Sequence, residues 1–167
     1  MRDESAAAAP SRIQTGAAPL QHPGPLSGRE RRRATYAALD LGTNNCRLLI
    51  AEPTFSGFRV IDAFSRIVRL GEGLGTSDRL SEAAIERTVE ALRICRTKMQ
   101  TRGVQRAKVI ATEACRLAVN GAAFVDRVRR GVGLDLEIVD RQTEAYLAVT
   151  GCAALADPLA ESVVIFD

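Results

Sequence analysis

The chain has 167 residues, of which 46% are apolar and 26% are charged, which fits one ordinary globular domain. No apolar run approaches the roughly 20 residues that a membrane-spanning helix needs, and no secretory signal is recognisable, so we expect a cytoplasmic protein without a membrane partner. The net charge of +3 resides in residues 1–34, and residues 35–167 are neutral overall, which argues against a specific nucleic-acid partner.

The scarcity of histidine limits the chemistry that the chain can perform. His22 is the one histidine, so catalysis by Cys-His or Ser-His-Asp groups and histidine-rich zinc sites are excluded. Carboxylates, hydroxyls, arginines and a hard metal ion remain as candidates. The four cysteines form no C-x-x-C pair and are expected to be reduced and buried: Cys46, Cys95, Cys115 and Cys152.

The first 34 residues predict a flexible tail. They contain four of the six prolines and almost no large apolar side chains, and therefore cannot bury enough surface to offset the entropy of ordering. A cluster of arginines at 29–33 could touch an anionic polymer, but a solvated charge run is the simpler interpretation.

Residues 36–50 predict two strands joined by a phosphate-binding turn. Gly42 would supply the conformational freedom for a sharp reversal, and Thr43, Asn44 and Asn45 would offer hydrogen-bond donors to an anion. Asp40 would repel phosphate, so it is expected to hold a cation or a water beside the bound group. An ordinary β-hairpin without a ligand is the alternative.

The rest of the chain predicts a mixed α/β sheet layered with helices. Residues 57–70 alternate as one long strand or two, and Ser81 is expected to cap a long helix that ends near Gly103. The expected helices are residues 82–101, 122–130 and 142–155, and the expected strands are residues 107–111, 135–139 and 162–167.

The last five residues, V-V-I-F-D, repeat the pattern of the strand that leads to Asp40. A buried strand that delivers an aspartate twice suggests two similar domains, each with a phosphate turn. We therefore expect a tail at 1–34, a first domain at 35–157, and the first strand of a truncated second domain at 158–167.

Four segments resemble the exopolyphosphatase and guanosine pentaphosphate phosphohydrolase (Ppx/GppA) family. The family's phosphate turn, D-[LIV]-G-[ST]-N-[ST]-x-[RH]-L, appears as D-L-G-T-N-N-C-R-L, with Asn45 in place of a hydroxyl residue. The other segments are R-I-V-R-L-G-E-G-L at 66–74, A-T-E-A-C-R-L-A-V-N at 111–120 and E-I-V-D-R-Q-T-E-A-Y-L at 137–147. The last departs from the family pattern, with Asp140-Arg141 for Ser-Gly and Thr143 for the first glutamate of a pair.

The resemblance implies an actin-like (ribonuclease H-like) mixed sheet with flanking helices, the first of two similar domains. By position in the motifs, Glu144 would be the catalytic base and Arg116 would bind the transferring phosphoryl group. Asp40 and Asp167 would position Mg²⁺, and residues 42–45 (Gly42, Thr43, Asn44 and Asn45) would cradle phosphate oxygens. Arginine forks and backbone N–H groups match phosphate oxygens well.

Several residues have a structural alternative. Glu113 could simply pair with Arg116, three residues later, and Arg116 could itself be an ordinary surface arginine. Asn120 is expected to cap the following helix, Glu72 to be solvated, and Glu137 to lie at a sheet edge.

The expected activity is an exopolyphosphatase or guanosine pentaphosphate phosphatase that uses Mg²⁺-assisted attack by water. The second domain, required in cis, would follow Asp167, so the chain alone is expected to fold partly and to hydrolyse little. A kinase of the same superfamily and a non-catalytic module that binds polyphosphate or guanosine polyphosphates are the alternatives. The sequence does not distinguish polyphosphate from guanosine pentaphosphate as the substrate, and it does not determine whether the protein forms a homodimer.

Overall fold

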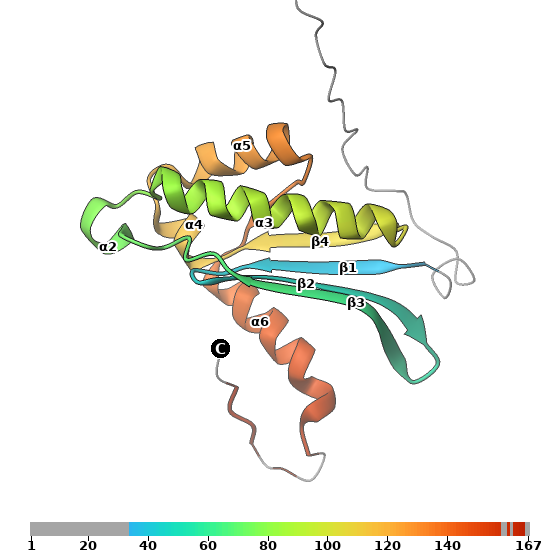
Figure 1. Ribbon diagram of the computed structural model, residues 1–167. Coiled ribbons are helices and arrows are strands. Elements are labelled where there is room, and N and C mark those ends of the chain that lie inside the picture. The colour runs from blue at the N-terminus through green and yellow to red at the C-terminus, as the bar shows by residue number, and fades with distance from the viewer. Residues whose placement is uncertain (1–33, 158–159, 161, 166–167) are drawn as a thin grey trace, which may run out of the picture.

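A computed structural model describes residues 34–157, 160 and 162–165. Its centre is a five-stranded mixed sheet with the strand order β3-β2-β1-β4-β5 (Figure 1). The antiparallel pairs β1–β2 and β2–β3 form a meander, and β4 and β5 extend it parallel to β1. The strands are β1 (Tyr36–Leu41), β2 (Asn45–Thr54), β3 (Gly57–Ile67), β4 (Arg106–Ala111) and β5 (Glu137–Ile138).

Helices lie on both faces of this sheet. In Figure 1, α3 and α5 cover one face and α6 lies on the opposite face. The helices are α2 (Leu74–Ser77), α3 (Glu82–Thr101), α4 (Glu113–Leu117), α5 (Gly121–Val132) and α6 (Arg141–Cys152), which continues into the 3₁₀ turn η1 (Ala153–Leu155). The arrangement agrees with the predicted mixed sheet with flanking helices.

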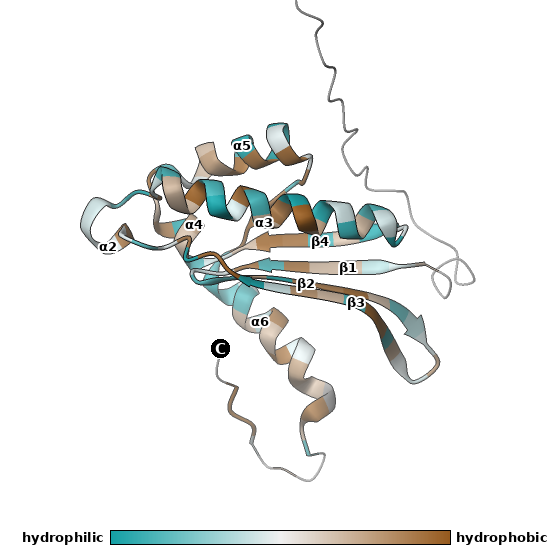
Figure 2. Cartoon of the chain, in the orientation of Figure 1, coloured by the Kyte–Doolittle hydropathy of each residue, from teal (hydrophilic) through white to brown (hydrophobic). Residues whose placement is uncertain are grey.

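The core lies between the sheet and the layer of α3 and α5. Alternate residues of β1, Leu39 and Leu41, are buried against an apolar stripe of α3 that includes Leu92 and Met99. Figure 2 shows apolar residues along the central strands and in bands on α3 that alternate with hydrophilic ones. By contrast, no residue of α6 is buried, so the second face is only lightly covered.

The long helix follows the sequence prediction closely. The Ser81 side chain accepts a hydrogen bond from the Ala84 amide at 3.3 Å and begins α3, and Gly103, at φ 61°, follows its end. Three cysteines are buried as expected, but Cys152 on α6 is partly exposed, because that helix buries no side chain.

Other expectations need correction. Gly42 does not adopt a positive φ, and a Cβ there would meet only the Asn45 carbonyl oxygen at 3.7 Å, so the turn does not require glycine for its conformation. The Asn120 side chain does not cap α5; its Oδ1 instead accepts from the Leu80 amide at 2.9 Å, and its Nδ2 donates to the Leu80 carbonyl oxygen at 3.0 Å.

The chain ends differ from the prediction as well. Residues 162–165 belong to no strand, since Val163 and Val164 are exposed and pair with no strand among the described residues. The tail proposed at 1–34 falls, except for residue 34, outside the described residues, and so does Asp167.

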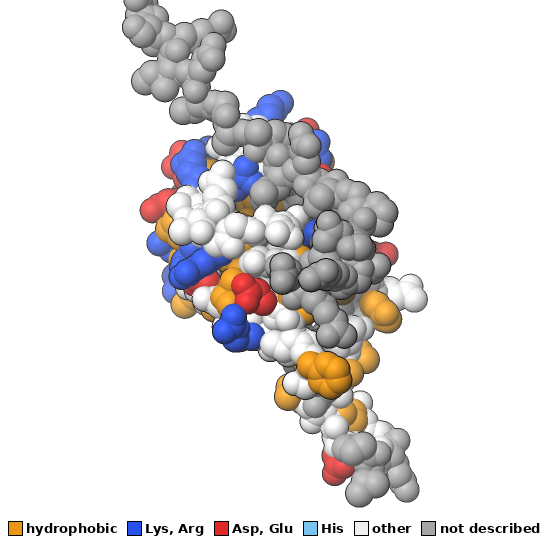
Figure 3. All heavy atoms as spheres, turned by 90° about the vertical axis from the view of Figure 1, so that its right-hand side faces the viewer, with side chains coloured by type: hydrophobic (Ala, Val, Ile, Leu, Met, Phe, Trp, Pro, Cys, Tyr) orange, Lys and Arg blue, Asp and Glu red, His pale blue; other side chains and the backbone are white. Residues whose placement is uncertain are grey.

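Charges of both signs are mixed on the surface. Figure 3 shows basic and acidic side chains close together on the face it presents, as expected from the neutral balance of residues 35–167. Within the part of the chain that the structure describes, no helix combines the length and the apolar character needed to cross a bilayer.

Asp62 joins the edge of the sheet to the end of α3. Its carboxylate accepts hydrogen bonds from Lys98 Nζ at 2.8 Å and Arg102 Nε at 2.9 Å. These bonds, from Lys98 first and then Arg102, lower the pKa of Asp62 from 3.8 to about 2. Because the folded-state pKa lies below the ordinary value, the ionised group stabilises the fold above its ordinary pKa, and this contribution is lost as the pH falls toward the folded-state pKa.

We therefore expect Asp62→Asn to lower the melting temperature by a few degrees at neutral pH, and the difference from the unmodified chain to disappear between about pH 4 and pH 2. Thermal unfolding followed by circular dichroism at several pH values measures this. Asp126→Asn removes an exposed carboxylate paired only with Arg129 at 3.4 Å and is the control, with little expected effect. A gap for Asp62→Asn that stays constant down to the lowest pH would contradict the assignment.

Candidate functional site

Three chain segments meet at the edge of the sheet where β1, β4 and β5 end. The Thr112 amide donates to the Leu41 carbonyl oxygen at 3.1 Å, and the Val139 amide donates to the Ala111 carbonyl oxygen at 3.1 Å. Because β1, β4 and β5 run parallel, their carboxyl ends lie side by side. The 42–45 turn, α4 and the start of α6 are thus brought together although they are far apart in the sequence.

Arg116 on α4 bridges these segments. Its Nη1 donates to the Val139 carbonyl oxygen at 2.6 Å and to Glu144 Oε2 at 3.1 Å, and its Nη2 lies 3.2 Å from the same carboxylate oxygen. Nη2 also donates to Glu113 Oε2. The structure thereby brings together two of the residues predicted from the sequence, Arg116 and Glu144, and adds Glu113 as a direct partner.

A fourth charged residue, Arg141, completes what we call the Arg–Glu cluster: Glu113, Arg116, Arg141 and Glu144. Arg141 Nη2 donates to Glu113 Oε1 at 2.8 Å. The cluster lines a cavity of about 340 Å³, together with Ala145, Ala148, Val149 and Ile165. Two cations and two anions leave the cavity without net charge.

Glu113 accepts hydrogen bonds from both arginines of the cluster. Hydrogen bonds from Arg141, and then from Arg116, lower the pKa of Glu113 below its ordinary value. Glu113 therefore remains ionised at any moderate pH and is a weak proton acceptor.

In the motif at 137–147, Arg141 was only a departure from the family pattern, and it was not predicted to belong to the site. The signal that could have identified it is its position: Asp140 caps α6 by accepting from the Thr143 amide at 2.6 Å, which places Arg141 at the first residue of the helix. Its side chain then lies beside Glu113 at the end of the sheet.

The 42–45 turn is held by its own backbone and by the loop after β3. The Gly42 amide donates to the Asn45 carbonyl oxygen at 2.9 Å, so this N–H is not directed at a ligand. The Asn44 carbonyl oxygen accepts from the Val68 amide at 2.8 Å, and the Thr43 carbonyl oxygen accepts from the Gly71 amide at 3.0 Å. Among the described residues, the amides of Thr43 and Asn44 have no hydrogen-bond partner, and these two are the donors that the turn can offer.

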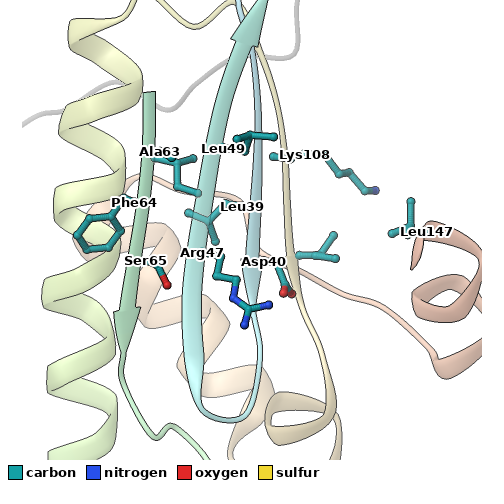
Figure 4. A pocket seen from close by; sticks show the side chains of 12 residues that line it. Leu39, Asp40, Arg47, Leu49, Ala63, Phe64, Ser65, Lys108 and Leu147 are labelled. Atoms are coloured by element: carbon teal, nitrogen blue, oxygen red, sulfur yellow. The ribbon is translucent and has the colours of Figure 1, made fainter. Parts of the chain in front are cut away.

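Asp40 lines a different hollow from that of the Arg–Glu cluster. It lines a groove of about 730 Å³ on the α6 side of the sheet, together with Arg47, Lys108 and Leu147 (Figure 4). Leu147, which lines the groove, and Glu144, which belongs to the Arg–Glu cluster, are one helical turn apart on α6. Arg116 and Glu144 line one cavity and Asp40 lines the other hollow in the described structure.

Few of the described side chains are placed to bind a metal ion together. No group of three acidic, histidine or cysteine side chains that could hold a metal occurs among the described residues, and Asp167 is not one of them. Magnesium is commonly bound by one or two carboxylates, by water and by substrate phosphates. Asp40 therefore fits the role of one ligand.

Comparison with known proteins gives a matching family and several similar solved structures. The model of the Ppx/GppA phosphatase family matches residues 49–167. The crystal structure of an Aquifex aeolicus Ppx/GppA family member is 33% identical with a TM-score of 0.69, and the match covers 72% of this chain and 39% of that one. An exopolyphosphatase from Cytophaga hutchinsonii is 27% identical with a TM-score of 0.69, over 74% of this chain and 39% of that one. The chain thus spans about two fifths of the length of these relatives.

These matches confirm the predicted fold class, an actin-like mixed sheet with flanking helices. The phosphate turn itself, at 42–45, precedes the residues that the family model matches.

The contact between Thr43 and Gly71 makes the turn testable. A Cβ at Gly71 would lie 2.5 Å from Thr43 Cγ2, so in Gly71→Ala the Thr43 side chain or the turn must shift, and we expect the change to destabilise the chain by about 1–3 kcal/mol. Thr43→Ser removes that methyl group and keeps the hydroxyl, so the double variant should recover most of the loss.

Urea unfolding of the four combinations measures the coupling between the two positions. Gly75→Ala is the control, because a Cβ there would meet nothing within 4 Å. A double variant as unstable as Gly71→Ala alone would show that the two residues are not in contact.

Proposed function

The chain belongs to the Ppx/GppA phosphatase family, and on this premise we propose that it supplies the phosphate turn and the catalytic base of an enzyme that removes the terminal phosphate from polyphosphate or guanosine pentaphosphate. The observation that carries the proposal is the contact between Arg116 and Glu144 inside a cavity of about 340 Å³. A guanidinium that binds phosphate oxygens beside a carboxylate that can accept a proton is the pair of groups that such a hydrolysis needs.

In this proposal Arg116 binds the terminal phosphoryl group. Its hydrogen bond to the Val139 carbonyl oxygen fixes the direction of the guanidinium, so little side-chain freedom is lost when phosphate binds. The positive charge then neutralises the charge that develops on the phosphoryl oxygens as the phosphoanhydride bond breaks.

Glu144 acts as the general base. It accepts a proton from the attacking water while the water oxygen bonds to phosphorus, and the rest of the substrate leaves one phosphate shorter. The choice of Glu144 over Glu113 follows the family motif, and the hydrogen bonds of Glu113 to both arginines, which lower the pKa of that carboxyl, suit it to a holding role. Glu113 instead holds the two arginines in place.

We also propose that Mg²⁺ takes part, with Asp40 as one ligand and Asp167, outside the described residues, as another. When bound, the ion would neutralise charge on the phosphate oxygens. The amides of Thr43 and Asn44 would donate to the same oxygens from the turn beside Asp40.

The active unit is proposed to include further residues that the relatives carry. The match to this chain covers only 39% of the Aquifex aeolicus relative, and Asp40 and the Arg–Glu cluster lie on separate hollows in the described structure. A substrate that contacts both needs additional protein to enclose it.

We expect Glu144→Gln, in the full-length polypeptide that carries this sequence, to reduce phosphate release about 10²- to 10⁴-fold, while substrate binding changes little, because the amide keeps the shape and loses the basicity. Phosphate release from polyphosphate and from guanosine pentaphosphate measures the activity, and calorimetry measures the binding.

The matched variant Glu113→Gln removes the other carboxylate of the cluster and should retain most of the turnover. An equal loss in both variants would contradict the assignment of the base. Tight binding without phosphate release from the unmodified protein would favour a binding module, and transfer of phosphate from ATP to a sugar would favour a kinase.

A second prediction compares the activity of the 167-residue chain with that of the full-length polypeptide. The 167-residue chain should release phosphate at a small fraction of the rate of the full-length polypeptide, because the further protein that would enclose a substrate between the two hollows would be missing. Parallel assays at equal molar concentration measure this, and equal rates would contradict it.

A further inference from the structure

Arg141 is the most exposed member of the Arg–Glu cluster. Its side chain is 74% exposed, whereas that of Arg116 is 20% exposed. Both line the same cavity, so Arg116 lies in its depth and Arg141 at its mouth. The two cations are therefore placed in succession along the path by which an anion would enter.

The two arginines are held in different ways. Arg116 is fixed by the Val139 carbonyl oxygen and by two carboxylates. Both side-chain hydrogen bonds of Arg141 go to one residue, Glu113: Nη2 to Oε1 at 2.8 Å and Nε to Oε2 at 3.4 Å. An exposed ion pair of this kind contributes little stability, so a more highly charged anion can displace Glu113 from Arg141.

The charged groups of the cavity favour an anion that carries more than one phosphate. The two carboxylates balance the two guanidinium groups. A phosphate bound at Arg116 competes with Glu113 Oε2 for Nη2, whereas Arg141 Nη2 is bonded to the other oxygen, Oε1. A chain of linked phosphates reaches further and places a second anionic group at the mouth, where Arg141 can form a charge-assisted hydrogen bond with it.

We propose that Arg141 binds the second phosphate of a linear phosphate chain whose terminal phosphate is held by Arg116. The inference rests on the proposed function for the identity of the site, and it adds a residue that sets the preference for a chain over a single phosphate. Arg141 thereby acts as a binding residue and takes no part in proton transfer.

The test is calorimetric binding of orthophosphate and of tripolyphosphate to the full-length polypeptide, in the Glu144→Gln background so that the tripolyphosphate is not hydrolysed. Adding Arg141→Gln should weaken tripolyphosphate binding about tenfold and leave orthophosphate binding unchanged, since one charge-assisted contact is lost from one ligand only. Arg141→Lys should recover part of the loss, because it keeps the charge without the fork.

The chain offers a closely matched control. Arg59 is 71% exposed and its Nη2 lies 2.8 Å from Glu52 on the β2–β3 hairpin, which is nearly the geometry of Arg141 and Glu113. Arg59→Gln should change neither affinity. Circular dichroism establishes that each variant is folded before it is titrated.

Unchanged tripolyphosphate binding in Arg141→Gln, equal weakening for both ligands, or absence of tripolyphosphate binding in the Glu144→Gln parent would each overturn the proposal. These results can be told apart from results that would reject the proposed function. Phosphate release by the unmodified protein together with an unaffected Arg141→Gln would reject the inference alone, and a protein that binds tripolyphosphate through Arg141 without hydrolysing it would reject the hydrolase alone.

Discussion

The guanidinium of Arg116 is the contact on which this edge of the molecule depends. It belongs to α4, yet it donates to a backbone carbonyl just after β5 and to a carboxylate on α6. The parallel pairing of β1, β4 and β5 brings these segments to one place, and the guanidinium fixes their relative positions once they are there. One side chain therefore links the order of the strands to the geometry of the cavity.

The elements that the sequence predicted well are those whose signals are local. The cap at Ser81, an apolar stripe over five turns and a terminal glycine determine α3 without reference to the rest of the chain, and its ends match the prediction at both residues. For the opposite reason, the strand expected at 162–167 is not formed over residues 162–165. An apolar segment becomes a strand only where another strand offers it hydrogen bonds, and residues 162–165 have no such neighbour in the described structure.

The residues of the candidate site also differ in whether local sequence signals could identify them. The motifs identified Arg116 and Glu144, which the fold does bring into contact. Spacing could not show that Asp40 lines the groove on the α6 side of the sheet and not the cavity of the Arg–Glu cluster, because this depends on how α6 packs against the sheet. The position of Arg141 at the start of α6 is readable from the sequence, but its contact with Glu113 depends on how the fold brings α6 beside α4.

The position of α6 and the charge of the site depend on the same four side chains. Since α6 buries no residue, the attachments of its first turns to the rest of the domain include the bonds of Arg116 to Glu144 and of Arg141 to Glu113. An anion that draws Arg141 away from Glu113 removes one of these attachments and supplies a new partner for the first residue of the helix. Binding of a phosphate chain and the placement of α6, which carries the proposed base, are therefore coupled by the structure of the Arg–Glu cluster itself.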